Sequence, residues 1–260
     1  MPYHLYITNK NYSSWSLRPW LLLRELGIPF VEEFRPLIPG TFSQPQWREF
    51  SPVAHVPCLH VLPDDTTTSA SGSKEEEGAE EEGKLVLWES LAIVEYLAET
   101  HPDKPVYPAS PRARAWARSA VAEMHASFAT IRQVMGMNVG VRIELGPAAF
   151  TKELVRELER IDELWTEGLR RFGGPFLAGR EFGAVDAFYA PVVLRLQTYV
   201  GALEMMGAEA RGYVARMMEV EGVREWVEDA LRETGREVVH EEECLEGEGK
   251  RLVADLRATA

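Results

Sequence analysis

Residues 9–27 read NKNYSSWSLRPWLLLRELG, and this stretch predicts a buried helix that follows a run of serines. Pro19 is tolerated in the first turn of a helix, because its missing N–H would have no partner there, so Ser16 is the expected N-cap. The following residues are apolar on most faces, which predicts that the helix is largely buried. Gly27 is expected to end the helix in a left-handed conformation.

Two serines, Ser13 and Ser14, precede this expected helix. The N-terminal end of a helix is electropositive, so an anion such as a thiolate is favoured there and a serine hydroxyl can donate to it. The alternative is a local capping cluster, since serine is common at helix starts. Because no cysteine lies between His4 and Val56, this region cannot hold a Cys-x-x-Cys redox centre.

Short apolar segments on both sides of the helix predict a small α/β domain over residues 1–100. The first two strands and the helix between them form a right-handed βαβ unit, and the next two read as a hairpin that precedes a helix starting at Ser90. This βαβ-ββα order is that of a thioredoxin-like fold. The expected strands cover residues 4–8, 30–34, 58–62 and 85–88.

An acidic tract over residues 63–84 interrupts the expected hairpin. It holds eight acidic residues and two lysines, so it carries −6 of the net charge of −13. Its composition cannot bury enough apolar surface to fold alone, which predicts a disordered insertion. Extending a hairpin loop by this much costs only about 1.6 kcal/mol of closure entropy, although an acidic docking arm is an alternative reading.

The rest of the chain predicts a second, all-α domain. Residues 101–111 contain four prolines and read as a linker, and residues 236–260 read as a charged tail. Asp186, three residues after Gly183, is expected to bond back to the start of its helix as in a capping box. Helices are expected over residues 112–135, 147–172, 184–203, 208–218 and 223–232 of the domain at 112–235, with a possible last one over 250–257.

The overall composition excludes several classes of protein. The 260 residues include two distant cysteines, Cys58 and Cys244, which fit neither a disulfide framework nor a metal site, and we expect no metal. A net charge of −13 argues against nucleic acid and anionic membranes as partners. No signal peptide or membrane-spanning run is visible, so a cytoplasmic location is expected.

Two further motifs have the residue types of a ligand site. The Val56-Pro57 bond precedes an apolar strand: a cis bond would turn the Val56 backbone outward toward an extended peptide ligand, whereas a trans proline that opens a strand is commoner. Ser90 is an expected N-cap, and the same helix start can bind a ligand carboxylate while Glu89 holds an ammonium group. His55 can donate to a carboxylate or be a surface residue.

In this order and spacing, the motifs resemble those of the cytosolic glutathione transferase superfamily, over roughly residues 3–226. SSWSLRPWLLLRELGIPF is similar to the serine-type N-terminal motif of the zeta and related classes. VPCL resembles the family's cis-proline turn, ESLAIVEYL its glutamyl-binding segment, and FLAGREFGAVDA a helix of its second domain. The resemblance implies a cis Val56-Pro57 bond and glutathione as co-substrate.

The resemblance also implies roles for single residues. Ser13 matches the catalytic serine and Ser14 its neighbour, and the spacing to the following arginine favours Ser13. The glutathione-binding residues would be Val56 for the cysteinyl backbone, with Pro57 at its turn, Glu89 and Ser90 for the γ-glutamyl group, and His55 for the glycyl carboxylate. We assign the substrate pocket to Tyr12, Trp15, Met124 and Phe128, although the last two are also typical core residues.

The function implied is that of a homodimeric glutathione transferase that conjugates glutathione to a small hydrophobic electrophile in detoxification. Two alternatives remain open. One is a non-catalytic interaction module of this fold, and the other is a glutathione-dependent isomerase of the maleylacetoacetate type. Trp15 stands where the zeta motif has a cysteine, which disfavours the isomerase.

Overall fold

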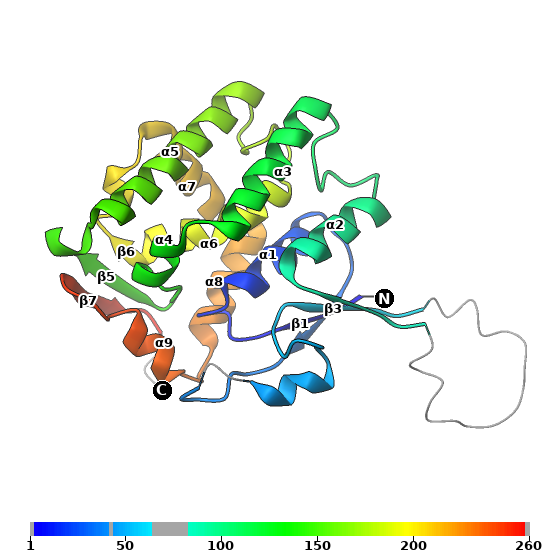
Figure 1. The fold of residues 1–260 in the computed structure, drawn as a ribbon, viewed down its shortest axis with the longest axis horizontal. Coiled ribbons are helices and arrows are strands. Elements are labelled where there is room, and N and C mark those ends of the chain that lie inside the picture. The colour runs from blue at the N-terminus through cyan, green and yellow to red at the C-terminus, as the bar shows by residue number, and fades with distance from the viewer. Residues whose placement is uncertain (1–2, 42–43, 64–82, 258–260) are drawn as a thin grey trace, which may run out of the picture.

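The computed structural model describes residues 3–41, 44–63 and 83–257. An N-terminal mixed sheet with its helices lies beside a larger helical region (Figure 1). The N-terminal elements are β1 (Tyr3–Ile7), α1 (Ser14–Glu25), β2 (Val31–Phe34), the 3-10 turn η1 (Pro45–Glu49), β3 (Cys58–Val61), β4 (Leu85–Trp88) and α2 (Ser90–Thr100).

The N-terminal sheet confirms the thioredoxin-like βαβ-ββα order. Its strands lie in the order β2-β1-β3-β4, with β1 parallel to β2 and antiparallel to β3. β3 and β4 form the expected antiparallel hairpin, and the acidic tract falls largely on residues 64–82, which are outside the described residues. Leu5 and Ile7 of β1 are completely buried, so the sheet supplies one wall of the core.

The helix α1 begins earlier than expected. Ser13, not Ser16, is the N-cap, and its hydroxyl oxygen accepts from the Ser16 N–H at 3.3 Å. Pro19 therefore lies beyond the first turn, where it removes one helical hydrogen bond. Gly27 has the predicted left-handed conformation, with φ of 61°.

Ser13→Ala is expected to lower the free energy of unfolding by about 1 kcal/mol, because the Ser16 N–H loses its capping partner. Urea denaturation measures the change. Ser14→Ala is the matched control: its hydroxyl has no hydrogen-bond partner among the described residues, so the expected change is below about 0.5 kcal/mol. A Ser13→Ala protein as stable as the parent would contradict this cap.

The second region is mainly helical, as expected. Its short segment over residues 101–110 joins α2 to α3 without helix or strand. The elements are α3 (Pro111–Ala126), α4 (Ala129–Val134), β5 (Val141–Leu145), the 3-10 turn η3 (Pro147–Ala149), α5 (Lys152–Phe172), α6 (Ala184–Thr198), β6 (Tyr199–Val200), the 3-10 turn η4 (Leu203–Met205), α7 (Ala208–Met218), α8 (Glu221–Arg232), α9 (Val238–Glu243) and β7 (Lys250–Asp255).

This region also contains a small sheet that the sequence analysis missed. β5 lies between β6 and β7, parallel to the first and antiparallel to the second. The helix expected over residues 250–257 is wrong, because this segment pairs with β5, which lies far away in the sequence. The helix expected over 112–135 is interrupted at Phe128, whose φ of 61° ends one helix before the next begins.

The two regions share one continuous core. α1 packs against β1 and α2 on one side and against α6 and α8 on the other. α6 is buried along almost its whole length. The expected capping box is present, since the Gly183 N–H donates to Asp186 Oδ2 at 3.1 Å. Of the residues described, no helix is long and apolar enough to cross a membrane.

Candidate functional site

The three candidate motifs leave the sheet at the same edge. Tyr6, near the end of β1, pairs with Cys58 at the start of β3, and Cys58 pairs with Trp88 at the end of β4. The loop to the serines, the proline turn and the start of α2 are therefore neighbours in space. The sheet brings together residues that are about 75 positions apart in the sequence.

The turn before β3 has the predicted geometry. The Val56-Pro57 bond is cis, which confirms the expectation, and the Trp88-Glu89 bond is also cis. Neither the N–H nor the C=O of Val56 has a backbone partner among the described residues, so both can pair with an extended peptide ligand. His55 is exposed beside this turn, and its ring Nδ1 lies 2.6 Å from the Val53 carbonyl oxygen.

The start of α2 differs from the prediction in its cap. Glu89, not Ser90, is the N-cap, and its carboxylate accepts from the Leu91 N–H at 3.2 Å. The same carboxylate lies 3.2 Å from His125 Nε2 on α3. The Ser90 hydroxyl is completely buried and has no hydrogen-bond partner in the described part of the chain. A buried hydroxyl without a hydrogen-bond partner costs free energy. A hydrogen bond from the Ser90 hydroxyl to a polar ligand group would supply the missing partner.

The two serines have different surroundings. The Ser13 hydroxyl donates to Ser16 Oγ at 2.8 Å while it caps α1, so its proton already has an acceptor. The Ser14 hydroxyl stands in the first turn of the helix with no partner among the described residues. Ser14 therefore has the proton that is free for a bound anion.

Of the four residues expected in the substrate pocket, the structure brings only some to the start of α1. Trp15 is half-buried, and its ring centroid lies 5.4 Å from that of His125. Tyr12 is buried instead, because the C-terminal segment folds back and Glu241 accepts its hydroxyl hydrogen at 2.5 Å. Met124 is buried in the core, and Phe128 is buried beside a separate hollow between α3 and α5. The structure therefore does not bring these three residues together with Trp15.

The sequence analysis missed two arginines and a histidine beside Trp15. The Arg18 guanidinium lies 4.1 Å from the Trp15 ring centroid, and the Arg132 guanidinium lies 5.8 Å from it. His125 completes the group through its contacts with Trp15 and Glu89. Burial, together with nearby Arg132, lowers the pKa of Arg18 to about 9. The signal in the sequence was an arginine within an otherwise apolar helix.

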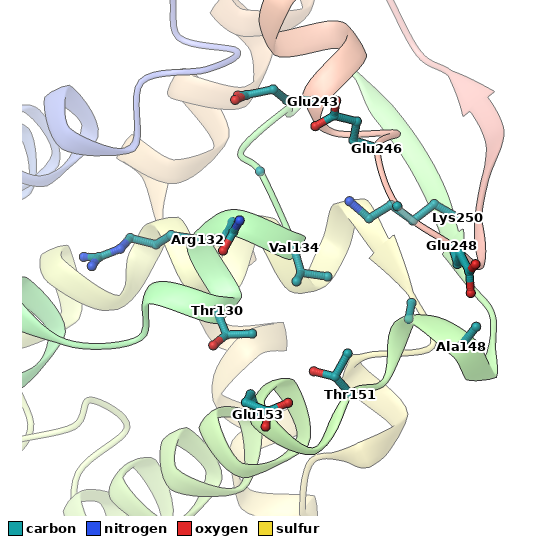
Figure 2. Close-up of a pocket in the computed structure, with 14 residues that line it drawn as sticks. Thr130, Arg132, Val134, Ala148, Thr151, Glu153, Glu243, Glu246, Glu248 and Lys250 are labelled. Carbon is teal, nitrogen blue, oxygen red and sulfur yellow. The ribbon is translucent and has the colours of Figure 1, made fainter.

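A pocket of about 880 Å³ lies beside α4 (Figure 2). It is formed by α4, the start of α5 and the C-terminal segment around Lys250. Figure 2 shows Lys250 extending into this pocket, whereas Arg132 extends away from the other labelled residues. Arg132 therefore belongs by its contacts to the Trp15 cluster, and the pocket itself is lined by none of the predicted site residues.

Comparison with known sequences identifies the N-terminal domain. Residues 12–100 match the family described as Glutathione S-transferase, N-terminal domain. The probable maleylacetoacetate isomerase of Caenorhabditis elegans is 31% identical over 110 residues, 42% of this chain and 50% of that protein. The stringent starvation protein A homolog of Pasteurella multocida (strain Pm70) is 29% identical over 136 residues, 52% of this chain and 59% of that protein. The chain spans about half the length of these curated relatives.

Comparison with solved structures shows the fold of most of the chain. Glutathione transferase Omega 3C from Trametes versicolor has a TM-score of 0.60 at 21% identity, over 87% of this chain and 84% of that one. A glutathione transferase homolog from Burkholderia GL BGR1, with bound glutathione, has a TM-score of 0.55 at 20% identity, over 88% of this chain and 98% of that one. Residues 12–100 therefore form a glutathione S-transferase N-terminal domain, and the chain has the fold of glutathione transferases of known structure.

Proposed function

We propose that this protein is a transferase that binds glutathione at the common edge of the N-terminal sheet and ionises its thiol at the start of α1. The observation that carries the proposal is the convergence of three unpaired groups at this edge. They are the Val56 backbone, the Ser90 hydroxyl and the Ser14 hydroxyl. The family match of residues 12–100 and the structural neighbour with bound glutathione support the same ligand.

The energetics require no general base. A thiol with a pKa near 8.5 is mostly protonated at neutral pH, and lowering that pKa by about two units needs ~2.7 kcal/mol. One hydrogen bond to a charged group contributes about 1.5–3 kcal/mol. The helix end adds roughly 0.3–1 kcal/mol. A single serine at the start of α1 is therefore sufficient, and the thiolate then attacks a small electrophile.

Either serine can fill this role, and the structure adds a reason to prefer Ser14. The alignment of the sequence motif favoured Ser13. If the Ser13 hydroxyl donated to the thiolate, it would have to give up its bond to Ser16 Oγ. Ser14 has no such bond to break. We therefore propose Ser14 as the donor to the thiolate and Ser13 as the cap that holds the first turn in place.

Ser90→Ala is expected to weaken glutathione binding about tenfold, because one hydrogen bond to the γ-glutamyl carboxylate is lost. Titration calorimetry with glutathione measures the change. The free energy of unfolding should stay the same or rise, since the substitution removes an unpaired buried hydroxyl. Ser119→Ala, on the exposed face of α3, is the matched control and should leave affinity unchanged. Parent protein that binds no glutathione would overturn the proposed function.

We also propose that this protein is of a serine-type, zeta-like class, that it is a homodimer, that it is located in the cytoplasm and that it has a role in detoxification.

Measurements of turnover distinguish two alternative functions. Glutathione binding without turnover of any electrophile favours an interaction module. Isomerisation of a cis-enedione diacid without net consumption of glutathione favours the activity named for the Caenorhabditis elegans relative.

A further inference from the structure

The turn before α1 forms one hydrogen-bonded unit with the two serines. The Asn9 carbonyl oxygen accepts from the N–H groups of Tyr12 and Ser13, at 3.1 and 3.0 Å. The Tyr12 carbonyl oxygen in turn accepts from the Ser14 N–H at 3.1 Å, and Ser13 is the N-cap of the helix. Because these bonds join the turn to the start of α1, a shift of the turn moves both serines.

The helical region anchors this turn. α8 packs against α1 (Figure 1), and Trp226 Nε1 of α8 donates to the Lys10 carbonyl oxygen at 2.9 Å. The Val139 N–H, between α4 and β5, donates to the Asn11 carbonyl oxygen at 3.2 Å. The groups proposed to bind glutathione lie in the N-terminal domain instead. The distance from the serines to the bound tripeptide therefore depends on the helical region.

Glu233, directly after α8, is the acceptor for two backbone N–H groups of the turn. Its carboxylate accepts from the Lys10 N–H at 2.6 Å, and from the Asn11 N–H and side-chain Nδ2 at 3.4 and 3.1 Å. Lys10 and Asn11 are both buried, and neither N–H has another acceptor among the described residues. Without Glu233, two buried donors would therefore lack a hydrogen bond.

The position of Glu233 is unfavourable for a carboxylate by itself. The C-terminal end of a helix is electronegative and favours cations. No cation forms a salt bridge with Glu233 within the described part of the chain, whereas Asp229, one turn earlier on α8, lies 2.7 Å from Lys10 Nζ. The N–H groups of the turn are therefore the groups that stabilise the charge of Glu233.

A second carboxylate holds the last residue of the turn before the serines. Glu241 of α9 accepts from the Tyr12 hydroxyl at 2.5 Å. Arg257 binds Glu241 and also donates to the Tyr12 hydroxyl, at 3.3 Å. The turn is thus held both by the end of α8 and by α9, so a change at Glu233 alone is expected to shift it rather than to release it.

We propose that Glu233 is a positioning residue of the thiol site, which acts through the turn to set the place of Ser14 relative to bound glutathione. A hydrogen bond weakens steeply once its donor leaves the preferred distance and angle. A displacement of about 1 Å, caused by a group away from the reacting atoms, is enough to lower a rate substantially. The inference rests on the proposed function, because it names a further residue of that same site.

The test uses the full chain with glutathione and an electrophile. Glu233→Ala is expected to raise the thiol pKa of bound glutathione by about one unit and to lower kcat at pH 6.5 about tenfold, with partial recovery near pH 9. Glutathione affinity should stay within about twofold, because the Val56 backbone and Ser90 are unchanged. Glu233→Gln keeps an oxygen that can accept from the turn, so it should restore most of kcat.

Two control variants separate positioning from loss of charge and from loss of stability. Glu228→Ala, on the exposed face of α8, removes the same charge and a bond to Arg232. Asp162→Ala removes a carboxylate that accepts from the Gly207 N–H at 2.8 Å, entirely within the helical region. Both controls should keep the thiol pKa of the parent, although Asp162→Ala is expected to lower the free energy of unfolding.

Amide hydrogen exchange of the ligand-free protein gives a readout that does not require glutathione. Glu233→Ala should speed exchange of the peptide over residues 12–17 at least about tenfold, and Asp162→Ala should not. Glu233→Asp keeps the charge but has a shorter reach, and it serves in the same measurements if Glu233→Ala does not fold. It should change the thiol pKa and the exchange rate in the same direction.

Three outcomes separate the inference from its alternatives. A thiol pKa and an exchange rate equal to those of the parent in Glu233→Ala would overturn it. A lower thiol pKa in both Glu233→Ala and Glu233→Gln would overturn it as well, because the carboxylate would then act on the thiolate by its charge. A parent that binds glutathione without lowering its thiol pKa contradicts the proposed function, and the exchange measurement alone then decides whether Glu233 positions the serines.

Discussion

Ser14→Ala is expected to raise the thiol pKa of bound glutathione by about one to two units, because the thiolate loses a hydrogen bond worth about 1.5–3 kcal/mol. Glutathione affinity should change little, since the Val56 backbone and Ser90 still hold the tripeptide. At about pH 6.5, turnover of an electrophile should fall at least about tenfold and recover partly near pH 9, where the thiol ionises unaided. Thiolate absorbance of the bound tripeptide, followed against pH, measures the shift directly.

The comparison with Ser13→Ala assigns the donor. Ser13→Ala is expected to cost stability through the lost cap but to shift the thiol pKa less than Ser14→Ala does. Ser14→Thr keeps a hydroxyl and should restore most of the activity at neutral pH. If Ser13→Ala raised the thiol pKa and Ser14→Ala did not, the donor would be Ser13. If neither substitution changed the thiol pKa, the chain would bind glutathione without activating it.

Local signals were sufficient to predict the N-terminal domain. The run of leucines after Pro19 predicts a buried helix by its composition, and Gly27 marks its end. For the helix, the deciding interactions lie within a few residues along the chain, so periodicity and turn chemistry carry the information. The hairpin of β3 and β4 followed from two apolar segments on either side of the acidic tract, whereas the cis bond before Pro57 followed from the resemblance to the family's turn, because local preference favours trans.

The predictions were wrong where contacts with distant segments of the chain determine the structure. Lys250–Asp255 reads equally well as a helix or a strand, and its pairing with β5 across about 105 residues selects the strand. Tyr12 looked like a pocket residue because nothing nearby reveals that Glu241 and Arg257 bind its hydroxyl. A sequence pattern indicates which face of a helix or strand a residue occupies. It does not indicate which distant segment of the chain packs on that face.

The side chains around Trp15 escaped prediction for a related reason. Arg18 was visible in the motif, but His125 and Arg132 lie on α3 and α4 without any shared spacing. Their convergence depends on the packing of α1 and α3 against α6. That Arg18 forms no salt bridge within the described residues is likewise a property of the folded chain, because the sequence contains 41 acidic residues.

Asp186→Ala is expected to lower the free energy of unfolding by about 3–5 kcal/mol, a large part of the stability of a domain. The carboxylate of Asp186 accepts from the N–H groups of Leu177 and Gly183 at 3.0 and 3.1 Å and from the Tyr213 hydroxyl at 2.9 Å. All three donors are buried, and each unpaired donor costs about 1–3 kcal/mol. Denaturant unfolding at neutral pH measures the loss. A loss below about 1 kcal/mol would contradict the role of Asp186 as their shared acceptor.

The pH dependence of stability provides a second test of the same carboxyl group. Burial raises the pKa of Asp186 to about 6, although its three donors oppose the shift, so the folded chain holds this proton more tightly than the unfolded chain does. The stability from this proton is fully present below about pH 4, and it is lost as the pH rises through about 6. Asp186→Asn does not titrate and still offers an oxygen to Leu177 and Tyr213, so the gap in stability between it and the parent should change over this range. A constant gap for Asp186→Asn over this range would mean that the pKa of Asp186 is not raised by burial.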